Sequence, residues 1–195
     1  MKRSVVILLT MALAGIHSSI IASDSIDLSG DWRFASDSDD KGLQQQWYQS
    51  ELPGNNNLTL PGSMQQQGYG NAPGPLTSWV GDIRESEWNK PKYAPYRTAD
   101  NFKMPFWLQP EKYYKGPAWY QQSVNIPQSW RGKHITLTLE RPHWQTRVWI
   151  DSSEAGSENY LSVPHTYDLS ELLMPGEHTL TIRVDNRMIV NVGPN

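Results

Sequence analysis

The chain has 195 residues, a net charge of −3, nine tryptophans and no cysteine. It is long enough for one sizeable domain of about 100–200 residues, but too short for a complete (β/α)₈ barrel of about 250 residues. The absence of cysteine excludes a disulfide scaffold and a zinc ribbon. The acidic balance argues against a nucleic-acid partner, because such domains present a basic face. The tryptophan content suits either carbohydrate stacking or a large β core.

Residues 1–23 have the pattern of a signal peptide. Lys2 and Arg3 precede an apolar run of about a dozen residues, and small residues follow up to Ser23. The run is too short for a membrane span, which needs about 20 apolar residues, so no span is expected. The alternative is a buried or anchoring N-terminal helix. We expect cleavage between Ala22 and Asp24, giving a secreted or periplasmic product with 15 basic and 20 acidic residues, a net charge of −5.

Most of the remaining chain alternates apolar and polar residues with the period of β-strands. The predicted strands cover 26–35 (with a bulge or turn at Gly30), 57–60, 118–126, 133–140, 144–151, 161–168 and 178–185. In the last of these, Leu180, Ile182 and Val184 form the predicted core face, and the alternate polar residues form the other face. Short strands at this spacing, with few helical windows, predict an all-β fold: a jelly-roll, galactose-binding-like β-sandwich over 24–195.

Residues 64–117 interrupt this pattern with Gly, Pro, Asn, Gln and aromatic residues. A stretch of this length is too long for an ordinary connection between strands. Its many aromatic side chains argue against disorder. We therefore expect an irregular, aromatic-rich insertion that is either packed against the sandwich or functional.

Five phrases in fixed order resemble the N-terminal sugar-binding domain of family 2 glycoside hydrolases, the group of β-galactosidases, β-glucuronidases and β-mannosidases. They are LSGDWRF at 28–34, TLPGS at 59–63, GPAWYQQSVNIP at 116–127, LTLERPHWQTRVWID at 137–151 and PHTYDLSELLMPGEHTLTIRVDNR at 164–187. The resemblance implies a jelly-roll domain followed, in such enzymes, by an immunoglobulin-like domain and a catalytic barrel. This sequence stops before either, and we interpret it as truncated before the barrel.

The resemblance also implies that this chain is non-catalytic by itself. Retaining glycosidases need two carboxyl groups about 5–5.5 Å apart, and the family carries both on glutamates of the barrel. The acidic pairs available here, Glu85 with Glu87 and Glu154 with Glu158, each lie in a Ser-rich, polar stretch interpreted as a loop, and they are interpreted as solvated acids. His143, His165 and His178 lack ligand spacing, so we expect no catalytic residue, metal or cofactor.

The predicted function is therefore the sugar-binding domain of a secreted family 2 glycoside hydrolase, β-galactosidase-like and acting in carbohydrate metabolism. Its expected partners are a β-glycoside and the missing catalytic domains. The sugar stays open among galactoside, glucuronide and mannoside. The alternative is a free-standing secreted carbohydrate-binding module, which would present an exposed aromatic platform, and a third possibility is a plain structural sandwich.

Two stretches near predicted strand ends supply candidate sugar contacts. Pro142 breaks the ladder at a corner and turns its neighbours out of the sheet, which makes Arg141, His143 and Trp144 candidates. The alternative assigns a buried ion pair to Arg141 or Arg147 and a core position to Trp144. Asp185, Asn186 and Arg187 end the last strand and have polar groups that could hydrogen-bond vicinal hydroxyls, although an interdomain or structural role fits them equally.

A third candidate stretch lies in the insertion, just before the strand at 118–126. In enzymes that this sequence resembles, the loop at this position can reach the rim of the active site. Here it carries Trp107, whose indole could stack on a sugar, and Gln109, whose amide both donates and accepts hydrogen bonds. The alternative is aromatic packing of the insertion onto the sandwich.

Overall fold

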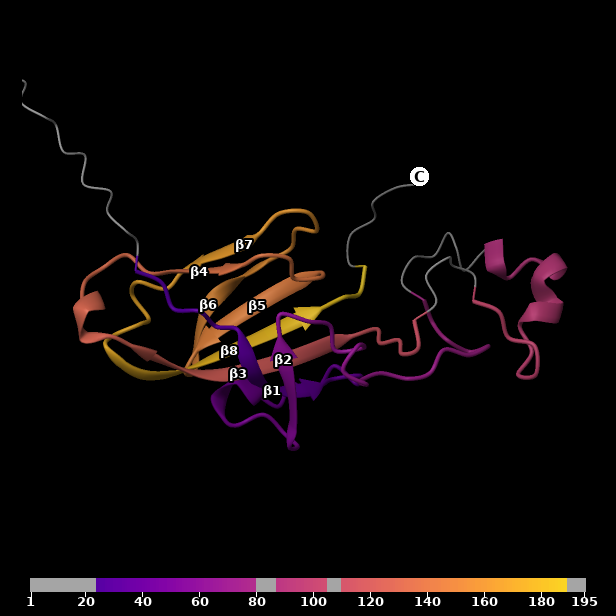
Figure 1. Ribbon diagram of the computed structural model, residues 1–195, viewed down its shortest axis with the longest axis horizontal. Coiled ribbons are helices and arrows are strands. Elements are labelled where there is room, and N and C mark those ends of the chain that lie inside the picture. Colours follow the sequence, from indigo (N-terminus) through magenta and orange to yellow (C-terminus); the bar gives the residue numbers. More distant parts are fainter. Residues whose placement is uncertain (1–23, 80–86, 105–109, 189–195) are drawn as a thin grey trace, which may run out of the picture.

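The computed structural model describes residues 24–79, 87–104 and 110–188. Within them the regular structure is almost entirely antiparallel β, which confirms the predicted fold class (Figure 1). One sheet has six strands in the order β2-β1-β3-β8-β5-β6, and the other has two, β4-β7. The strands are β1 (Gly30–Ser36), β2 (Asn56–Leu60), β3 (Pro117–Ile126), β4 (Thr136–Leu139), β5 (Gln145–Ile150), β6 (Ser153–Glu158), β7 (His165–Asp168) and β8 (Gly176–Asp185).

The ten-residue strands β3 and β8 form the centre of the larger sheet. Their register pairs Pro117 with Asp185 and Ile126 with Gly176. Asp185 is also opposite Gln145, the first residue of β5, and β1 ends on the same side, where Ser36 pairs with Ala118. The end of β8 therefore lies beside the beginnings of its two neighbours, which defines one end of the sandwich.

The main core lies between the two sheets. It is formed by apolar side chains at alternate positions of the strands, because successive side chains of a strand point to opposite faces. From the larger sheet come Phe34, Val148 and Ile182, and from the smaller sheet come Leu137 and Tyr167, all of them buried. Leu180 and Ile182 were predicted to face the core, and they do.

A second apolar cluster lies on the opposite face of the larger sheet. It contains Leu52, Trp119 and Trp149 and is covered by the 37–52 connection, which includes the short 3₁₀ helix η1 (Trp47–Gln49). The Tyr48 ring stacks on Trp149 with ring centroids 4.9 Å apart. The polar face predicted for 178–185 is therefore also covered, and its residues Thr181, Arg183 and Asp185 are buried.

Strand β6 corrects the sequence-based interpretation of Glu154 and Glu158 as loop residues. The segment pairs with β5, with Thr146 opposite Glu158 and Ile150 opposite Ser153. It forms the edge of the larger sheet, and its side chains are exposed or half-buried. An edge strand buries little apolar surface, so its sequence lacks the alternation that identifies the other strands.

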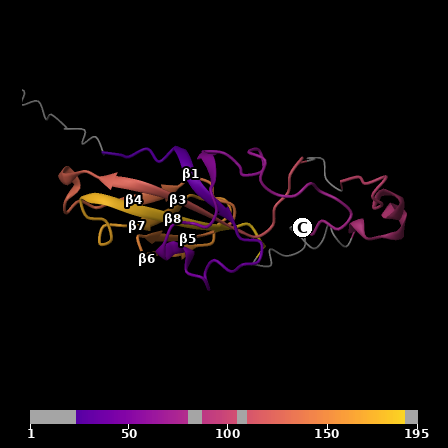
Figure 2. The same ribbon diagram turned by 90° about the horizontal axis from the view of Figure 1, so that it is seen from below.

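The insertion connects β2 to β3 and projects from the sandwich in both ribbon views (Figures 1 and 2). Its described residues include the 3₁₀ helix η2 (Pro91–Tyr96) and a single bridge between Asn71 and Tyr113. A third 3₁₀ helix, η3 (Gln128–Trp130), follows β3. Across the described ranges, no helix is both long and apolar enough to cross a membrane.

Candidate functional site

The end of β8 brings together the candidate residues from the two stretches near strand ends. Asp185 and Asn186 end or follow that strand, and the corner that carries Arg141, His143 and Trp144 precedes β5, its neighbour. The Trp144 N–H donates to the Asp185 carbonyl at 3.1 Å, which holds the corner against the strand end. We call these five residues the strand-end site. Trp107 and Gln109 lie outside the described residues.

A partly buried charge network underlies the strand-end site. Asp185 is 2% exposed and accepts hydrogen bonds from Arg183 at 3.0 Å and from Arg187 at 2.5 Å. The same two guanidinium groups donate to Asp40, at 2.9 Å from Arg183 and 2.6 Å from Arg187. Two carboxylates thus alternate with two guanidinium groups, and the network joins the β1–β2 connection to the end of β8.

The network fixes the protonation of its members. Burial alone raises the pKa of Asp185, but the hydrogen bonds from Arg187 and the charges of both arginines outweigh it, so that the pKa is lowered. The pKa of Asp40 is lowered in the same way, because its bonds to Arg187 and Arg183 outweigh burial. The pKa of Arg187 is raised, chiefly by its hydrogen bonds to Asp185. Both carboxylates are therefore ionised at neutral pH, and both are paired with the two arginine side chains.

Asn186 connects the strand end to the base of the insertion. Its side-chain oxygen accepts from the Gly116 N–H at 2.8 Å, and its amide nitrogen donates to the Tyr114 carbonyl at 2.7 Å. The Tyr114 hydroxyl, in turn, donates to the Pro117 carbonyl at 2.5 Å and accepts from the Asp37 N–H at 2.9 Å. Burial raises the pKa of Tyr114 to about 12. Both polar atoms of the Asn186 side chain thus already contact the protein's own backbone.

The corner residues differ in exposure. Arg141 and His143 are exposed, and neither forms a hydrogen bond or an ion pair within the described part of the chain. Trp144 is 5% exposed and lies inside the fold. Arg147, the other arginine considered for an ion pair, donates to Glu154 at 2.8 and 2.6 Å on the sheet surface. Arg141 and His143 are therefore the two members of the strand-end site that are free to meet a ligand.

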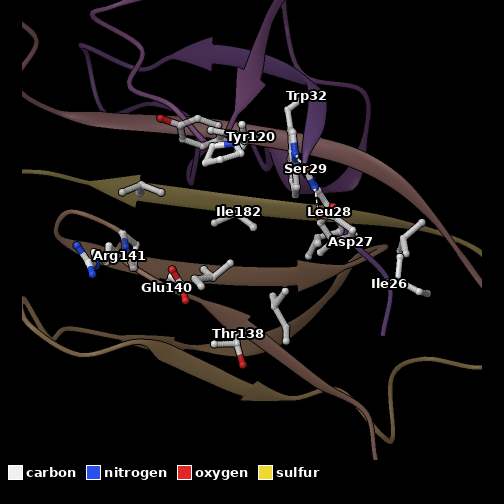
Figure 3. Close-up of a pocket in the computed structure, with 18 of the residues that line it drawn as sticks. Ile26, Asp27, Leu28, Ser29, Trp32, Tyr120, Thr138, Glu140, Arg141 and Ile182 are labelled. Atoms are coloured by element: carbon white, nitrogen blue, oxygen red, sulfur yellow. Dashed lines mark hydrogen bonds between the residues drawn. The ribbon is translucent and has the colours of Figure 1, made fainter. Parts of the chain in front are cut away.

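A groove of about 1510 Å³ lies between the two sheets and reaches the strand-end site. Figure 3 shows its apolar floor at Ile182, with Trp32 and Leu28 on one side and Thr138 of β4 on the other. Glu140 and Arg141 line the groove at the corner that follows β4, as do His143 and Asn186. The lining is thus mainly apolar along the groove and polar at both ends, at the strand-end site and around Asp24 and Lys133.

Several residues that shape this end were not found from the sequence. Asp40 and Tyr114 were not predicted to contribute, and Arg183 was assigned only to a polar face. Asp40 and Arg183 are 143 positions apart in the chain, so no local pattern connects them. One usable signal was the acidic run ending at Asp40, which adopts a left-handed backbone conformation with φ of 55°. No cluster of metal-ligating side chains occurs in the ranges that the structure describes.

The two antiparallel layers define the class of this protein, an all-β sandwich domain of the jelly-roll kind with a projecting insertion at one end. The chain belongs to the family described as "Glycosyl hydrolases family 2, sugar binding domain", whose sequence profile matches residues 26–191.

Three similar proteins are β-glucuronidases. The one from Paenibacillus borealis is 24% identical over 161 residues, which are 82% of this chain and 21% of that protein. The structure of Ruminococcus gnavus β-glucuronidase has a TM-score of 0.55 and 20% identity, covering 82% of this chain and 20% of that chain. A β-glucuronidase from an uncultured Clostridium sp. has the same TM-score, 17% identity and coverage of 82% and 21%. The chain thus spans about a fifth of the length of these relatives.

Proposed function

We propose that this chain is the sugar-binding domain of an exported family 2 glycoside hydrolase that acts on β-glucuronides, and that it is non-catalytic by itself. The observation that carries the proposal is the family match over 26–191. The share of its relatives that it spans, about a fifth, supports a role as one domain of a longer enzyme. The pattern at 1–23 supports export.

The charge network supports a non-catalytic role. A general acid in glycoside hydrolysis needs a carboxyl group whose pKa is raised, so that it holds a proton near neutral pH. The two carboxylates of the charge network, Asp40 and Asp185, have lowered pKa values, and each accepts hydrogen bonds from two arginines. Their task is to hold the strand end together rather than to transfer a proton.

Two observations favour a glucuronide among the three sugars left open by the sequence. The similar proteins named above are β-glucuronidases. At the strand-end site, Arg141 presents an exposed guanidinium group that no described carboxylate occupies. A guanidinium group can bind a carboxylate through two parallel hydrogen bonds. Glucuronic acid carries such a carboxylate, whereas galactose and mannose do not.

The test compares this chain with the longer enzyme that contains it. We expect the 195-residue chain to release no nitrophenol from nitrophenyl β-glucuronide, and the longer enzyme to hydrolyse it in preference to the β-galactoside and β-mannoside. In the longer enzyme, Arg141→Ala should raise KM for the glucuronide about tenfold, and Arg131→Ala is the matched control at the opposite end of the sandwich. Turnover by the short chain would refute the non-catalytic role. A preference for another sugar would refute the substrate class.

Export has its own test. We expect the protein recovered from outside the cytoplasm to begin between Ala22 and Asp24. N-terminal sequencing of the exported protein measures this directly. An intact Met1 on that protein would contradict cleavage.

A further inference from the structure

A second pocket, distinct from the groove, lies at the base of the insertion. Its volume is about 450 Å³, within the range of about 300–1,000 Å³ that is typical of small-molecule sites. Residues from 71–78 and 113–115 line it, together with Ser38 of the β1–β2 connection, and the bridge between Asn71 and Tyr113 joins the two parts of the insertion beside it. None of the five residues of the strand-end site lines this pocket. It is therefore a separate candidate site, which we call the insertion pocket.

Polar side chains that can form further hydrogen bonds line the insertion pocket. The Ser38 hydroxyl and the Asn71 side-chain amide form no hydrogen bond within the described part of the chain. The Thr77 hydroxyl accepts from a backbone N–H at 2.7 Å and the Ser78 hydroxyl accepts from Lys115 at 3.2 Å, but neither donates to another described residue. Hydroxyl and amide groups both donate and accept. This lining suits a small ligand that itself carries several hydroxyl groups, which is the chemistry of a sugar.

Lys115 gives the insertion pocket a positive charge that lacks a counter-ion. The residue is half-buried, and its ammonium group donates to the Ser78 hydroxyl at 3.2 Å and to the Trp79 carbonyl at 2.9 Å. Both acceptors are neutral, and among the described residues no acidic side chain lines the pocket or pairs with Lys115. An ammonium group has three N–H donors, so one remains for a ligand. The strongest hydrogen bond that it can form there is with an anion.

An aromatic residue completes the lining. Tyr113 borders the pocket, and its ring packs against Trp79 with ring centroids 4.7 Å apart. Trp79 is 4% exposed, so a buried side chain supports this wall. Aromatic rings provide an apolar surface beside the polar groups, and a sugar ring likewise has an apolar face and polar edges.

We propose that the insertion pocket binds a sugar that carries a carboxylate, such as a uronic acid. The carboxylate is bound by Lys115, and the ring hydroxyls are bound by Ser38 and Asn71. This binding goes beyond the proposed function, because it requires neither the catalytic domains nor Arg141. Its ligand is either a free acidic sugar or the acidic end of a glycan chain, since both present the same carboxylate and hydroxyl groups.

Calorimetric titration of the 195-residue chain tests the proposal. The chain carries Arg141→Ala, so that the strand-end site does not contribute to binding. We expect glucuronate to bind at least tenfold more tightly than glucose, which lacks the carboxylate, and than acetate, which lacks the ring. Equal binding of glucose or of acetate would overturn the proposal. A disaccharide that ends in glucuronate distinguishes the two sources, because tighter binding of the disaccharide indicates a glycan end and equal binding indicates a free sugar.

Three substitutions locate the binding. Lys115→Met should weaken glucuronate binding at least tenfold, because a hydrogen bond to a charged group is lost. Lys112→Met is the matched control and should have no effect, because Lys112 is also half-buried but does not line the pocket. Ser38→Ala removes no hydrogen bond within the described protein and should weaken binding about threefold, which keeps the test valid if Lys115→Met lowers the melting temperature.

Full affinity in both Lys115→Met and Ser38→Ala would overturn the proposal, and so would equal losses in Lys115→Met and Lys112→Met. The hydrolysis of nitrophenyl β-glucuronide by the longer enzyme is a separate measurement. Its failure would refute the proposed function and would leave the binding result unaffected.

Discussion

The two ends of the sandwich use charged side chains in opposite ways. Beneath the strand-end site, Arg183 and Asp185 are buried and belong to a network of four charges. At the opposite end, His178 bonds to Asp151 at 2.9 Å, and Asp151 is more than half exposed. The Asp151 carboxylate of the second pair reaches solvent, whereas Arg183 and Asp185 are almost fully enclosed. The difference shows that the cost of losing a charge depends on what remains buried beside it.

The largest effect should come from Asp185→Asn. The substitution leaves Arg183 and Arg187 with Asp40 as their remaining carboxylate, and breaking a buried ion pair costs about 3 kcal/mol of unfolding free energy. Asp151→Asn at the opposite end is the matched control, and we expect it to cost about 1 kcal/mol or less. Urea denaturation of the two variants measures both losses of unfolding free energy. Equal losses of unfolding free energy in the two variants would show that the burial of Asp185 does not increase the cost of losing its charge.

Gly42→Ala should also destabilise the strand-end side. A β-carbon at Gly42 would lie 2.6 Å from the Trp119 indole nitrogen and 2.8 Å from an Asp37 carboxylate oxygen. That oxygen accepts hydrogen bonds from the Gly42 N–H and from the Trp119 ring, so neither neighbour can withdraw without losing a bond. Overpacking of this kind costs about 1–3 kcal/mol. Thermal unfolding measures it, and Gly74→Ala, with open space around it and no left-handed backbone, is the control for steric contact. A melting temperature equal to that of the parent would contradict the tight packing.

The His178–Asp151 pair predicts a small pH dependence. Burial lowers the pKa of His178, but its hydrogen bonds to Asp151 and to the Met174 carbonyl, together with the charge of Asp151, outweigh burial, and the pKa is raised above 6.5. The charged pair therefore contributes stability that is fully present below about pH 6.5 and is lost as the pH rises through the folded-state pKa. The pKa of Asp151 is lowered, because its bonds from Thr179 and His178 outweigh burial, so its own contribution is lost only in acid.

Melting temperatures of the parent and of His178→Gln at pH 5.5 and pH 8 measure this contribution. We expect the parent to lose more stability than the variant between the two values, by less than about 1 kcal/mol. An identical pH dependence in both proteins would show that the pair does not titrate in this range.

The smallest effect should come from Lys133→Ala. Lys133 bonds to Asp24 at 2.6 Å, but both side chains are about half exposed. Screening by salt and the loss of side-chain conformational freedom cancel most of the stabilisation that such an ion pair provides. We expect a melting temperature unchanged within error at physiological salt. A clear loss would mean that the segment before β1 depends on this contact.

The sequence predicts the sandwich well because the main core needs only local alternation. Leu180 and Ile182 identify their face of β8 without any knowledge of its neighbours. The second apolar cluster could not be predicted in this way, because Trp149 and Leu52 meet only after the chain folds back over the sheet. The polar residue Thr181 has the sequence signature of a solvated face and is nevertheless fully buried.

The site was predictable in position but not in its contacts. The Pro142 corner and the end of the last strand pointed to Arg141 and Asp185, and the structure places both at one end of the sandwich. The role of Asp185 in the network depends on Asp40, from a connection far away in the sequence. Such partnerships follow from topology, which strand periodicity does not encode.

The Asn186 side chain has a mechanical consequence for the molecule. By bonding to Gly116 and Tyr114, it fastens the end of the last strand to the base of the projecting insertion. The two segments are about 70 positions apart in the chain, yet neither can swing without breaking these bonds. A pull on the chain where it leaves β8 therefore loads these two bonds as well as the strand pairing, so the base of the insertion helps to anchor the end of the last strand.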